Sequence, residues 1–426
     1  MSDNYNMTAK AKSKVKSKTK GAVVVKKTGA PFSKKTIRNI FISVIAALIL
    51  ITTFIIIFYL RKKEADRTVK IAFCDISQEM VENIKKEIPE IEGIKIDYSY
   101  LNKNDLAAGT VSEKFDLLFA SDGELTNSLE KFSEEIPNRF LQTIPNSMRS
   151  KKAFPILLNH YELCFYKPVL EKNNLEYPES WSAFVDYLKE ASKHVFTPFF
   201  CEGKNDRSLL ALLGAIVEAR TGYQSYNKLI ELFKNANSLD DILDVELGKD
   251  SEETVTVRLI LDMFKDWAVE GLVHPLWYTA NRNDALYFME QNQVGVLFQS
   301  LTEHRTVPYS IIKDYESLRF PVEGTMDLHG LISPAVVCLI LSNNMNNNDL
   351  LKPFTTTDVQ SRLSMLTQLG PTQYQSESYD RQADDVRFWA ASCKGGNLPD
   401  LALAVYQRNE DGLKKMAEEI RQYLKN

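Results

Sequence analysis

Cysteine is scarce in this chain, and its spacing excludes the usual cysteine-based sites. Among 426 residues there are five cysteines, with no CxxC pair and no zinc-finger spacing: Cys74, Cys164, Cys201, Cys338 and Cys393. Cys74, Cys164 and Cys338 lie inside apolar runs, where a thiol acts as a small hydrophobic side chain. Buried free thiols are therefore favoured over a disulfide framework, although disulfide pairing stays open as the alternative.

The familiar catalytic motifs are also missing. The five histidines show no HExxH or HxH spacing, and no GxSxG, GxxxxGK(S/T) or GxGxxG is present. These absences argue against zinc proteases, α/β-hydrolases, P-loop enzymes and dinucleotide-binding enzymes. A pair of glycosidase carboxylates stays open, because such a pair is assembled in space and leaves no local motif. We expect no enzymatic activity and no cofactor.

Acidic residues are nearly absent from the amino-terminal tail. Residues 1–38 carry eleven Lys and Arg and a single acid, Asp3, whereas residues 64–426 hold 38 basic and 55 acidic residues. Phosphate binding needs a basic footprint, so the acidic body argues against nucleic acid as a partner. The tail has no apolar periodicity and is predicted to be disordered, with contact to anionic lipid headgroups as the alternative.

Long apolar runs are limited to one, Ile40–Leu60, which has 21 residues and no charge. At ~1.5 Å per residue, a helix of this length reaches about 30 Å, the thickness of a hydrocarbon core. The run ends in bulky residues and offers no small-x-small cleavage site and no cysteine for lipid attachment. We therefore predict an uncleaved transmembrane helix over residues 39–61. The basic tail, residues 1–38, should face the cytoplasm, and residues 64–426 should lie in the periplasm or outside the inner membrane.

The body alternates strand-like and helix-like segments. Apolar or alternating runs predict strands at 68–74, 94–101, 115–124, 153–166, 294–300 and 332–342. Helical spacing predicts helices at 180–192 with Ser180 as N-cap, 206–222, 251–271 with Ser251 as N-cap, 283–291, 349–368, 384–393 and 410–424. Strand-rich sequence thus brackets a helix-rich middle. This order predicts an α/β fold of two lobes, with chain crossings near 160–168 and 318–332.

Four stretches of the body carry a family resemblance. They are "FDLLFASDGEL", "PILLNHYELCFYKPVLEKNNLEYPESWSAFVDYLKEA", "MFKDWAVEGLVHPLWYTANRNDALYFMEQNQVGVLFQS" and "LGPTQYQ", followed by terminal helices. In this order and spacing, residues 68–424 resemble the bacterial extracellular solute-binding proteins of ABC sugar importers, the maltose-binding type.

The resemblance implies a periplasmic-binding-protein-like fold with a hinge and a central ligand cleft. Lobe 1 would comprise residues 68–164 and 330–375, lobe 2 residues 165–325, and the C-terminal helices residues 376–426. It further implies capture of a carbohydrate, or a similar polyhydroxylated solute, for delivery to an ABC permease. The alternative is a membrane-anchored sensor or scaffold that uses the same two-lobed fold.

Nine residues are candidates for binding the solute, because sugar sites combine aromatic surface with a few placed polar groups. Asp122 and Glu124 follow a strand end, Asn159 and Tyr161 share one face of the crossing strand, and Trp277 and Tyr278 are adjacent in a loop. The remaining candidates are Gln299, Glu303 and Trp389. The alternatives are a solvated turn for the acids and packing for the aromatic residues. No metal site is predicted.

Overall fold

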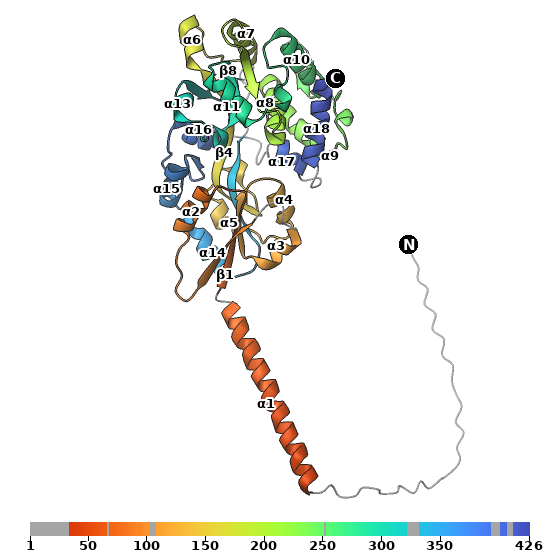
Figure 1. Cartoon of the computed structure of the whole chain (residues 1–426), viewed down its shortest axis with the longest axis vertical. Coiled ribbons are helices and arrows are strands. Elements are labelled where there is room, and N and C mark those ends of the chain that lie inside the picture. The colour runs from red at the N-terminus through yellow and green to blue at the C-terminus, as the bar shows by residue number, and fades with distance from the viewer. Residues whose placement is uncertain are drawn as a thin grey trace, which may run out of the picture. The chain divides into compact units, whose positions relative to one another are not determined.

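The computed structural model describes residues 34–65, 68–101, 108–250, 253–321, 332–392, 401–406 and 412–426 (Figure 1). These residues fall into two units, divided between Glu64 and Ala65. In the first unit, helix α1 (Lys34–Ala65) contains the apolar stretch Phe41–Phe58, whose mean hydropathy is 3.0. Among the described residues, α1 is the single helix long and apolar enough to cross a membrane. It covers the span predicted from the sequence, residues 39–61.

The second unit is built on a sheet whose first part has the strand order β2–β1–β3–β10–β4. The strands of this part are β1 (Thr68–Cys74), β2 (Lys95–Leu101), β3 (Leu117–Ser121), β4 (Ala153–Tyr166) and β10 (Ile332–Ile340). The pairs of β1 with β2 and with β3 are parallel, and β10 is antiparallel to both of its neighbours. The predicted strands are thus confirmed, and parallel pairing is the expected product of strand–helix–strand units.

Strand β4 belongs to both halves of the sheet. Its residues from Ala153 to His160 pair with β10, and those from Tyr161 to Tyr166 pair with β8 (Val294–Ser300) and β9 (Tyr315–Leu318). Beyond β8 lies β5 (Thr197–Cys201). The hydrogen-bonded order is continuous through β4, and among the described strands β4 is the one that pairs in both halves. The first predicted crossing is confirmed here, and the second falls mostly on residues 322–331, outside the described residues.

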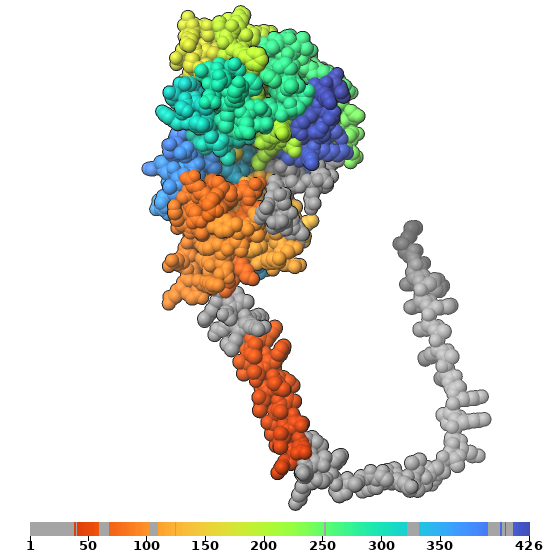
Figure 2. Space-filling model, viewed as in Figure 1, coloured from red at the N-terminus to blue at the C-terminus, as the bar shows by residue number. Residues whose placement is uncertain are grey.

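Strand β4 changes its pairing partners between His160 and Tyr161, and this position is called the switch point here. Two large apolar clusters flank it. The first core packs β1, β3, β10 and the first half of β4 against α2 (Gln78–Glu87), α15 (Thr357–Thr367) and α16 (Arg381–Ser392). The second core packs the other half of β4, β5 and β8 against α7 (Trp181–Ala191), α8 (Asp206–Thr221), α9 (Tyr223–Asn235), α10 (Val257–Glu270), α17 (Leu401–Tyr406) and α18 (Gly412–Lys425). Figure 2 shows residues 68–101 (orange) toward one end of the body and residues 167–221 (yellow to yellow-green) toward the other.

Shorter elements connect these layers. The short helices and 3₁₀ turns are α3 (Ala108–Lys114), α4 (Glu124–Glu130), α5 (Asn138–Leu141), η2 (Asn146–Met148), α6 (Lys167–Asn173), η3 (Leu239–Asp241), η4 (Trp277–Thr279), α11 (Arg282–Glu290), α12 (Leu301–His304), α13 (Tyr309–Ile312), α14 (Asn347–Leu351) and η5 (Lys352–Thr355). The short strands are β6 (Gly248–Lys249), β7 (Thr254–Val255) and β11 (Gly370–Pro371). Two of these short elements, η4 and α12, carry residues of the candidate site.

Helix ends follow local chemistry in most places. The Ser180 side chain accepts a hydrogen bond from the Ala183 amide, as an N-cap should, and Gly271 ends α10 with a φ of 73°. The predicted N-cap Ser251 is wrong, because α10 begins only after Thr256, whose side chain accepts from the Leu259 amide. Residues 254–255 instead pair with 248–249 as a small hairpin, and this pairing removes them from the helix.

The cysteines confirm the expected burial. Cys74, Cys164, Cys201 and Cys338 are buried, the last three as free thiols, and Cys393 lies outside the described residues. Burial raises the pKa of the Cys164, Cys201 and Cys338 thiols well above its usual range. Three of these thiols serve as small packing groups, but Cys164 has polar neighbours that apolar spacing did not indicate.

Candidate functional site

Polar side chains from both cores meet beside the switch point of β4. Asp122 follows the carboxyl end of β3, Asn159 and Ser333 lie opposite each other on β4 and β10, and Arg207 lies in the first turn of α8. The Arg207 guanidinium donates to the Asp122 carbonyl oxygen at 2.7 Å and to the Ser333 hydroxyl at 3.2 Å. A side chain of α8, a helix of the second core, thereby bonds directly to two residues beside the first part of the sheet.

Helix α12, whose Leu301 packs in the first core, joins the same region from the end of β8. Its Thr302 amide donates to the Asn159 side-chain oxygen at 3.1 Å. The Glu303 carboxylate accepts from the Ser300 amide at 2.8 Å and from the Asn205 side chain at 3.3 Å. Because Asn205 also caps α8, the acid and Arg207 are both held beside the start of that helix. Three of the nine predicted residues, Asp122, Asn159 and Glu303, are thus brought together.

Gln299 is placed differently. It is fully buried on β8, its side-chain oxygen accepts from Arg282 at 3.0 Å, and its amide donates to the Cys164 sulfur at 3.0 Å. Arg282 also pairs with Glu202 at 2.7 Å. Burial raises the pKa of Glu202, the nearby Glu303 raises it further, and Arg282 opposes both effects. In this conformation the polar atoms of Gln299 are therefore engaged in hydrogen bonds with other protein groups.

Two predicted aromatic rings lie in the second core. Tyr161 is 6% exposed and stacks on Phe298, with ring centres 5.2 Å apart. Trp277 is 2% exposed, and its ring centre lies 4.6 Å from that of Phe264. Stacking on a pyranose needs an open ring face, so both rings act as packing in this conformation. The burial of both rings agrees with the alternative that these aromatic residues only pack in the interior. Contact of Tyr161 and Trp277 with a solute stays a prediction.

The aromatic loop is held by close backbone contact. Gly203 donates to the Trp277 carbonyl at 3.2 Å, and a β-carbon at Gly203 would lie 2.4 Å from the Tyr278 α-carbon. Only glycine permits this approach. Tyr278 stays half-buried, with its ring nearly perpendicular to that of Trp277. Of the predicted aromatic pair, Tyr278 is therefore the member with a free surface.

Two further predictions concern Trp389 and Glu124. Trp389 is half-buried on α16, and its ring lies 4.7 Å from that of His160, next to the first core. Glu124 is the first residue of α4, and its side chain lies outside the described residues. The assignment of Trp389 and Glu124 to the solute site stays a prediction.

Sequence reasoning missed Arg207, Asn205 and Ser333. Arg207 was seen only as part of a helix start, because a single basic residue beside a cap has no motif. Its bonds to Asp122 and Ser333 join residues separated by 85 and 126 positions. The one available signal was the dense polar run "EGKNDRS" (202–208) directly before an apolar helix.

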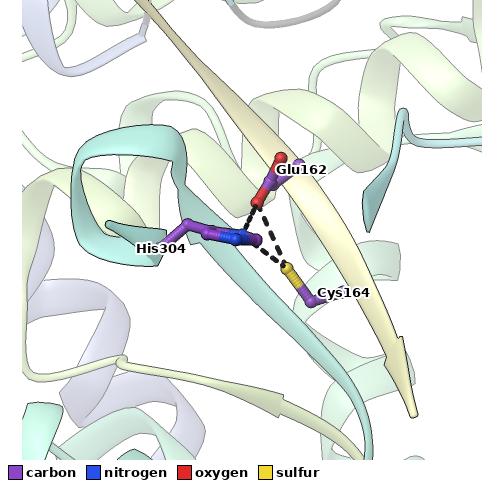
Figure 3. A group of neighbouring side chains, drawn as sticks. All are labelled: Glu162, Cys164 and His304. Atoms are coloured by element: carbon purple, nitrogen blue, oxygen red, sulfur yellow. Dashed lines mark hydrogen bonds and ion pairs between the residues drawn. The ribbon is translucent and has the colours of Figure 1, made fainter. Parts of the chain in front are cut away.

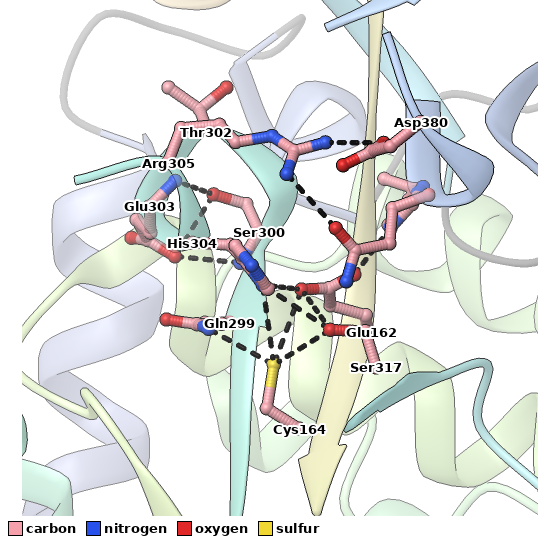
Figure 4. Close-up of polar contacts among 12 residues, drawn as sticks. Glu162, Cys164, Gln299, Ser300, Thr302, Glu303, His304, Arg305, Ser317 and Asp380 are labelled. Carbon is pink, nitrogen blue, oxygen red and sulfur yellow. Dashed lines mark hydrogen bonds and ion pairs between the residues drawn. The ribbon is translucent and has the colours of Figure 1, made fainter. Parts of the chain in front are cut away.

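A fully buried polar cluster lies on the other face of β4. His160 bonds Glu162 at 2.8 Å. His304 bonds the same carboxylate at 2.6 Å, and Ser317 donates to it at 3.0 Å (Figure 4). Burial alone would raise the pKa of Glu162, but the bonds from both histidines hold it well below its usual range. Glu162, Cys164 and His304 form the one group of potential metal ligands found among the described residues.

A separate hollow lies at the surface of the second core. It measures about 720 Å³ and lies between η3 and α18, lined by Leu239, Lys414, Glu418, Gln422 and Tyr423 among others. None of the nine predicted residues lines it, and it lacks the convergence of polar groups from two cores. We therefore base the site on the contacts around Arg207.

No family model and no curated protein matches the chain, whereas solved structures do. The solute receptor AcbH, described as preferring β-D-galactopyranose, matches with a TM-score of 0.63 at 13% identity, over 84% of this chain and 92% of its own. A sugar transporter protein of Bacillus licheniformis in complex with stachyose gives 0.54 at 12%, over 84% and 98%. A maltose-bound T. maritima protein gives 0.53 at 15%, over 83% and 99%. The body therefore has the two-lobed fold of solute-binding proteins.

Proposed function

We propose that this chain is a membrane-anchored, extracytoplasmic solute-binding protein that captures a carbohydrate and delivers it to an ABC permease. The observation that carries the proposal is the meeting of polar residues from elements of both cores beside β4, a strand that the two sheet halves share. A hinge needs few connections between lobes, and a binding site between lobes needs polar groups from both. The β4 switch point and the contacts around Arg207 supply these two features.

In this proposal the solute binds among Asp122, Asn159, Glu303 and Arg207. Carboxylate and amide oxygens accept hydrogen bonds from sugar hydroxyls, and the guanidinium donates to hydroxyl and ring oxygens. Tyr278 contributes apolar ring surface. The Arg207 bonds to Asp122 and Ser333 are between protein groups. Solute hydroxyls would replace these bonds when the lobes close around them, and the closed population would rise accordingly.

The sugar class and the permease partner are supported by the fold likeness. Receptors that share the fold are described with galactopyranose, stachyose and maltose. A saccharide also suits a site rich in oxygen acceptors with one cation and one half-buried aromatic ring. We assign lobe 1 to the side of the first core and lobe 2 to the side of the second, close to the boundaries expected from the sequence.

Removal of the Asp122 carboxylate should weaken solute binding. Hydrogen bonds to charged groups contribute about 1.5–3 kcal/mol, so Asp122→Ala should weaken affinity about 10–100-fold. Native mass spectrometry of the purified chain identifies the co-purified solute, and calorimetric titration with that solute gives the affinity. Glu270→Ala, an exposed acid at the end of α10, should bind as the unmodified chain does.

If Asp122→Ala binds as tightly as the unmodified chain, the site is elsewhere. If no saccharide is retained or bound, the anchored sensor or scaffold is favoured. The observation that supports this second function is the direct Arg207 bridge, which can hold two cores together without help from a solute.

The proposed anchoring predicts a specific protease pattern. With α1 across the inner membrane, protease added to cells stripped of their outer layers should degrade residues 64–426 and leave the tail intact. The reason is the excess of Lys and Arg in residues 1–38, which favours a cytoplasmic tail. Immunoblotting with tags at each end provides the measurement, and permeabilised cells provide the control. Recovery of a soluble protein that begins near residue 61 would contradict anchoring.

A further inference from the structure

The buried cluster around Glu162 plays no part in the proposed solute site. Four of its side chains come from three elements: Glu162 and Cys164 from β4, His304 from α12 and Ser317 from β9 (Figure 3 draws the first three). None of the four is more than 6% exposed. The cluster therefore joins the crossing strand to the two segments that pack beside its second half.

The four atoms at the centre of this cluster form a compact tetrahedron. From the Glu162 Oε1 atom, His304 Nδ1 lies at 2.6 Å, Ser317 Oγ at 3.0 Å and Cys164 Sγ at 3.2 Å. The other edges are 3.3 Å from Ser317 to His304, 3.3 Å from Ser317 to Cys164, and 3.7 Å from Cys164 to His304. The centre of such a tetrahedron lies about 2 Å from each corner, close to zinc–ligand bond lengths of ~2.0–2.3 Å.

The charge of the cluster also suits a cation. Among the described residues, no Lys or Arg pairs with Glu162, and its neighbours are two histidines, a hydroxyl and a thiol. Its ion pairs are with His160 and His304, which carry charge only when protonated, and a buried carboxylate without a charged partner is costly. A divalent cation bound to one carboxylate, one thiolate and neutral imidazole gives a site with no net charge. Metal coordination removes the thiol proton even where burial favours the neutral thiol.

Outer hydrogen bonds orient the ligand atoms. The Gln299 amide donates to the Cys164 sulfur at 3.0 Å, and Arg282 holds the Gln299 oxygen at 3.0 Å. His160 bonds the second Glu162 oxygen at 2.8 Å and leaves the first one for the centre. Metal sites commonly have such supporting bonds, and their removal weakens metal binding about 10–100-fold.

We propose that Glu162, Cys164 and His304 bind one divalent metal ion, with the Ser317 hydroxyl as the fourth ligand. Mixed sulfur, nitrogen and oxygen ligands in tetrahedral geometry favour zinc. All four positions are filled by protein atoms and the site is buried, so the ion is structural. It ties β4 to α12 and β9 at the point where the chain passes between the two cores.

The test measures metal in the full chain, purified in detergent from cells grown with added zinc or added cobalt. Elemental analysis should find about one zinc per chain after exposed metal has been removed by a chelator. The cobalt-grown protein should show an intense thiolate-to-cobalt absorption band. Cys164→Ser should abolish this band, and Gln299→Ala should weaken metal binding about 10–100-fold. Cys338→Ser changes a buried thiol that packs in the first core and donates to the Leu339 carbonyl, and should keep both signals.

A folded, unmodified chain with no bound zinc and no cobalt–thiolate band overturns the proposal. Full metal content in folded Cys164→Ser and His304→Gln variants also overturns it, because the metal would then lie elsewhere. If these variants do not fold, the unmodified chain still decides. The cobalt band requires no mutation, and a chelator strong enough to remove the metal should lower the melting temperature.

Discussion

Replacement of Trp277 by alanine is expected to destabilise the folded body by about 3–5 kcal/mol, the usual cost of removing a buried Trp or Phe side chain. The ring is 2% exposed and packs against Phe264, with ring centres 4.6 Å apart. Around it the backbone is fixed by the close approach to Gly203, so the structure cannot easily collapse into the cavity. Chemical denaturation followed by far-UV circular dichroism gives the change in free energy of unfolding.

Tyr278→Ala provides the matched variant. This neighbour in the same 3₁₀ turn is half-buried, so its truncation should change stability less and solute affinity more. Loss of a covered ring should weaken binding by roughly 1–3 kcal/mol, or about 10–100-fold. If instead Trp277→Ala folds normally and loses affinity, Trp277 contacts the solute and the loop must open before binding.

Removal of the Arg220 guanidinium should have a comparable cost. Arg220 on α8 donates two hydrogen bonds to Asp250, at 2.8 and 2.5 Å, and one to Glu253 at 3.0 Å. The Arg220 and Asp250 side chains are only 6% and 8% exposed. Breaking such a buried pair leaves a charge without its partner, so Arg220→Ala should cost about 3–5 kcal/mol of folding free energy.

The control is Arg258→Ala. Arg258 also binds one aspartate, Asp244, through two nitrogens, but these side chains are 41% and 72% exposed. Exposed pairs contribute about 0–1 kcal/mol, so this variant should unfold almost as the unmodified chain does. Equal losses for Arg220→Ala and Arg258→Ala would show that burial does not set the strength of these pairs.

The proposed solute site and the proposed metal site lie on opposite faces of the same strand. Along β4, Asn159 faces Thr302, while Glu162 and Cys164 face His304 and Ser317. Helix α12 contacts both, through Thr302 and His304. A metal ion on one face would therefore fix the position of α12, which also carries the candidate solute ligand Glu303.

The sequence by itself determined the elements with strong periodicity. The strands at 68–74 and 153–166 have the bounds that the sequence predicted, because each is a mainly apolar run between polar turns. Ser180 begins α7 and Gly271 ends α10 where the sequence predicted, since capping depends on neighbouring backbone groups. The apolar span inside α1 can be identified from its length and composition alone.

Only the tertiary structure decided which of the predicted site residues come together. Trp277 and Tyr278 are neighbours in the sequence, yet packing against Phe264 buries one and leaves the other half-buried. Arg207 reaches Asp122 across 85 positions, and Glu162 reaches His304 across 142. Such contacts depend on where β4 changes its pairing partners, and no local pattern encodes that point. Periodicity and capping act within a few residues, whereas a binding site is made by side chains that only the folded chain brings within bonding distance.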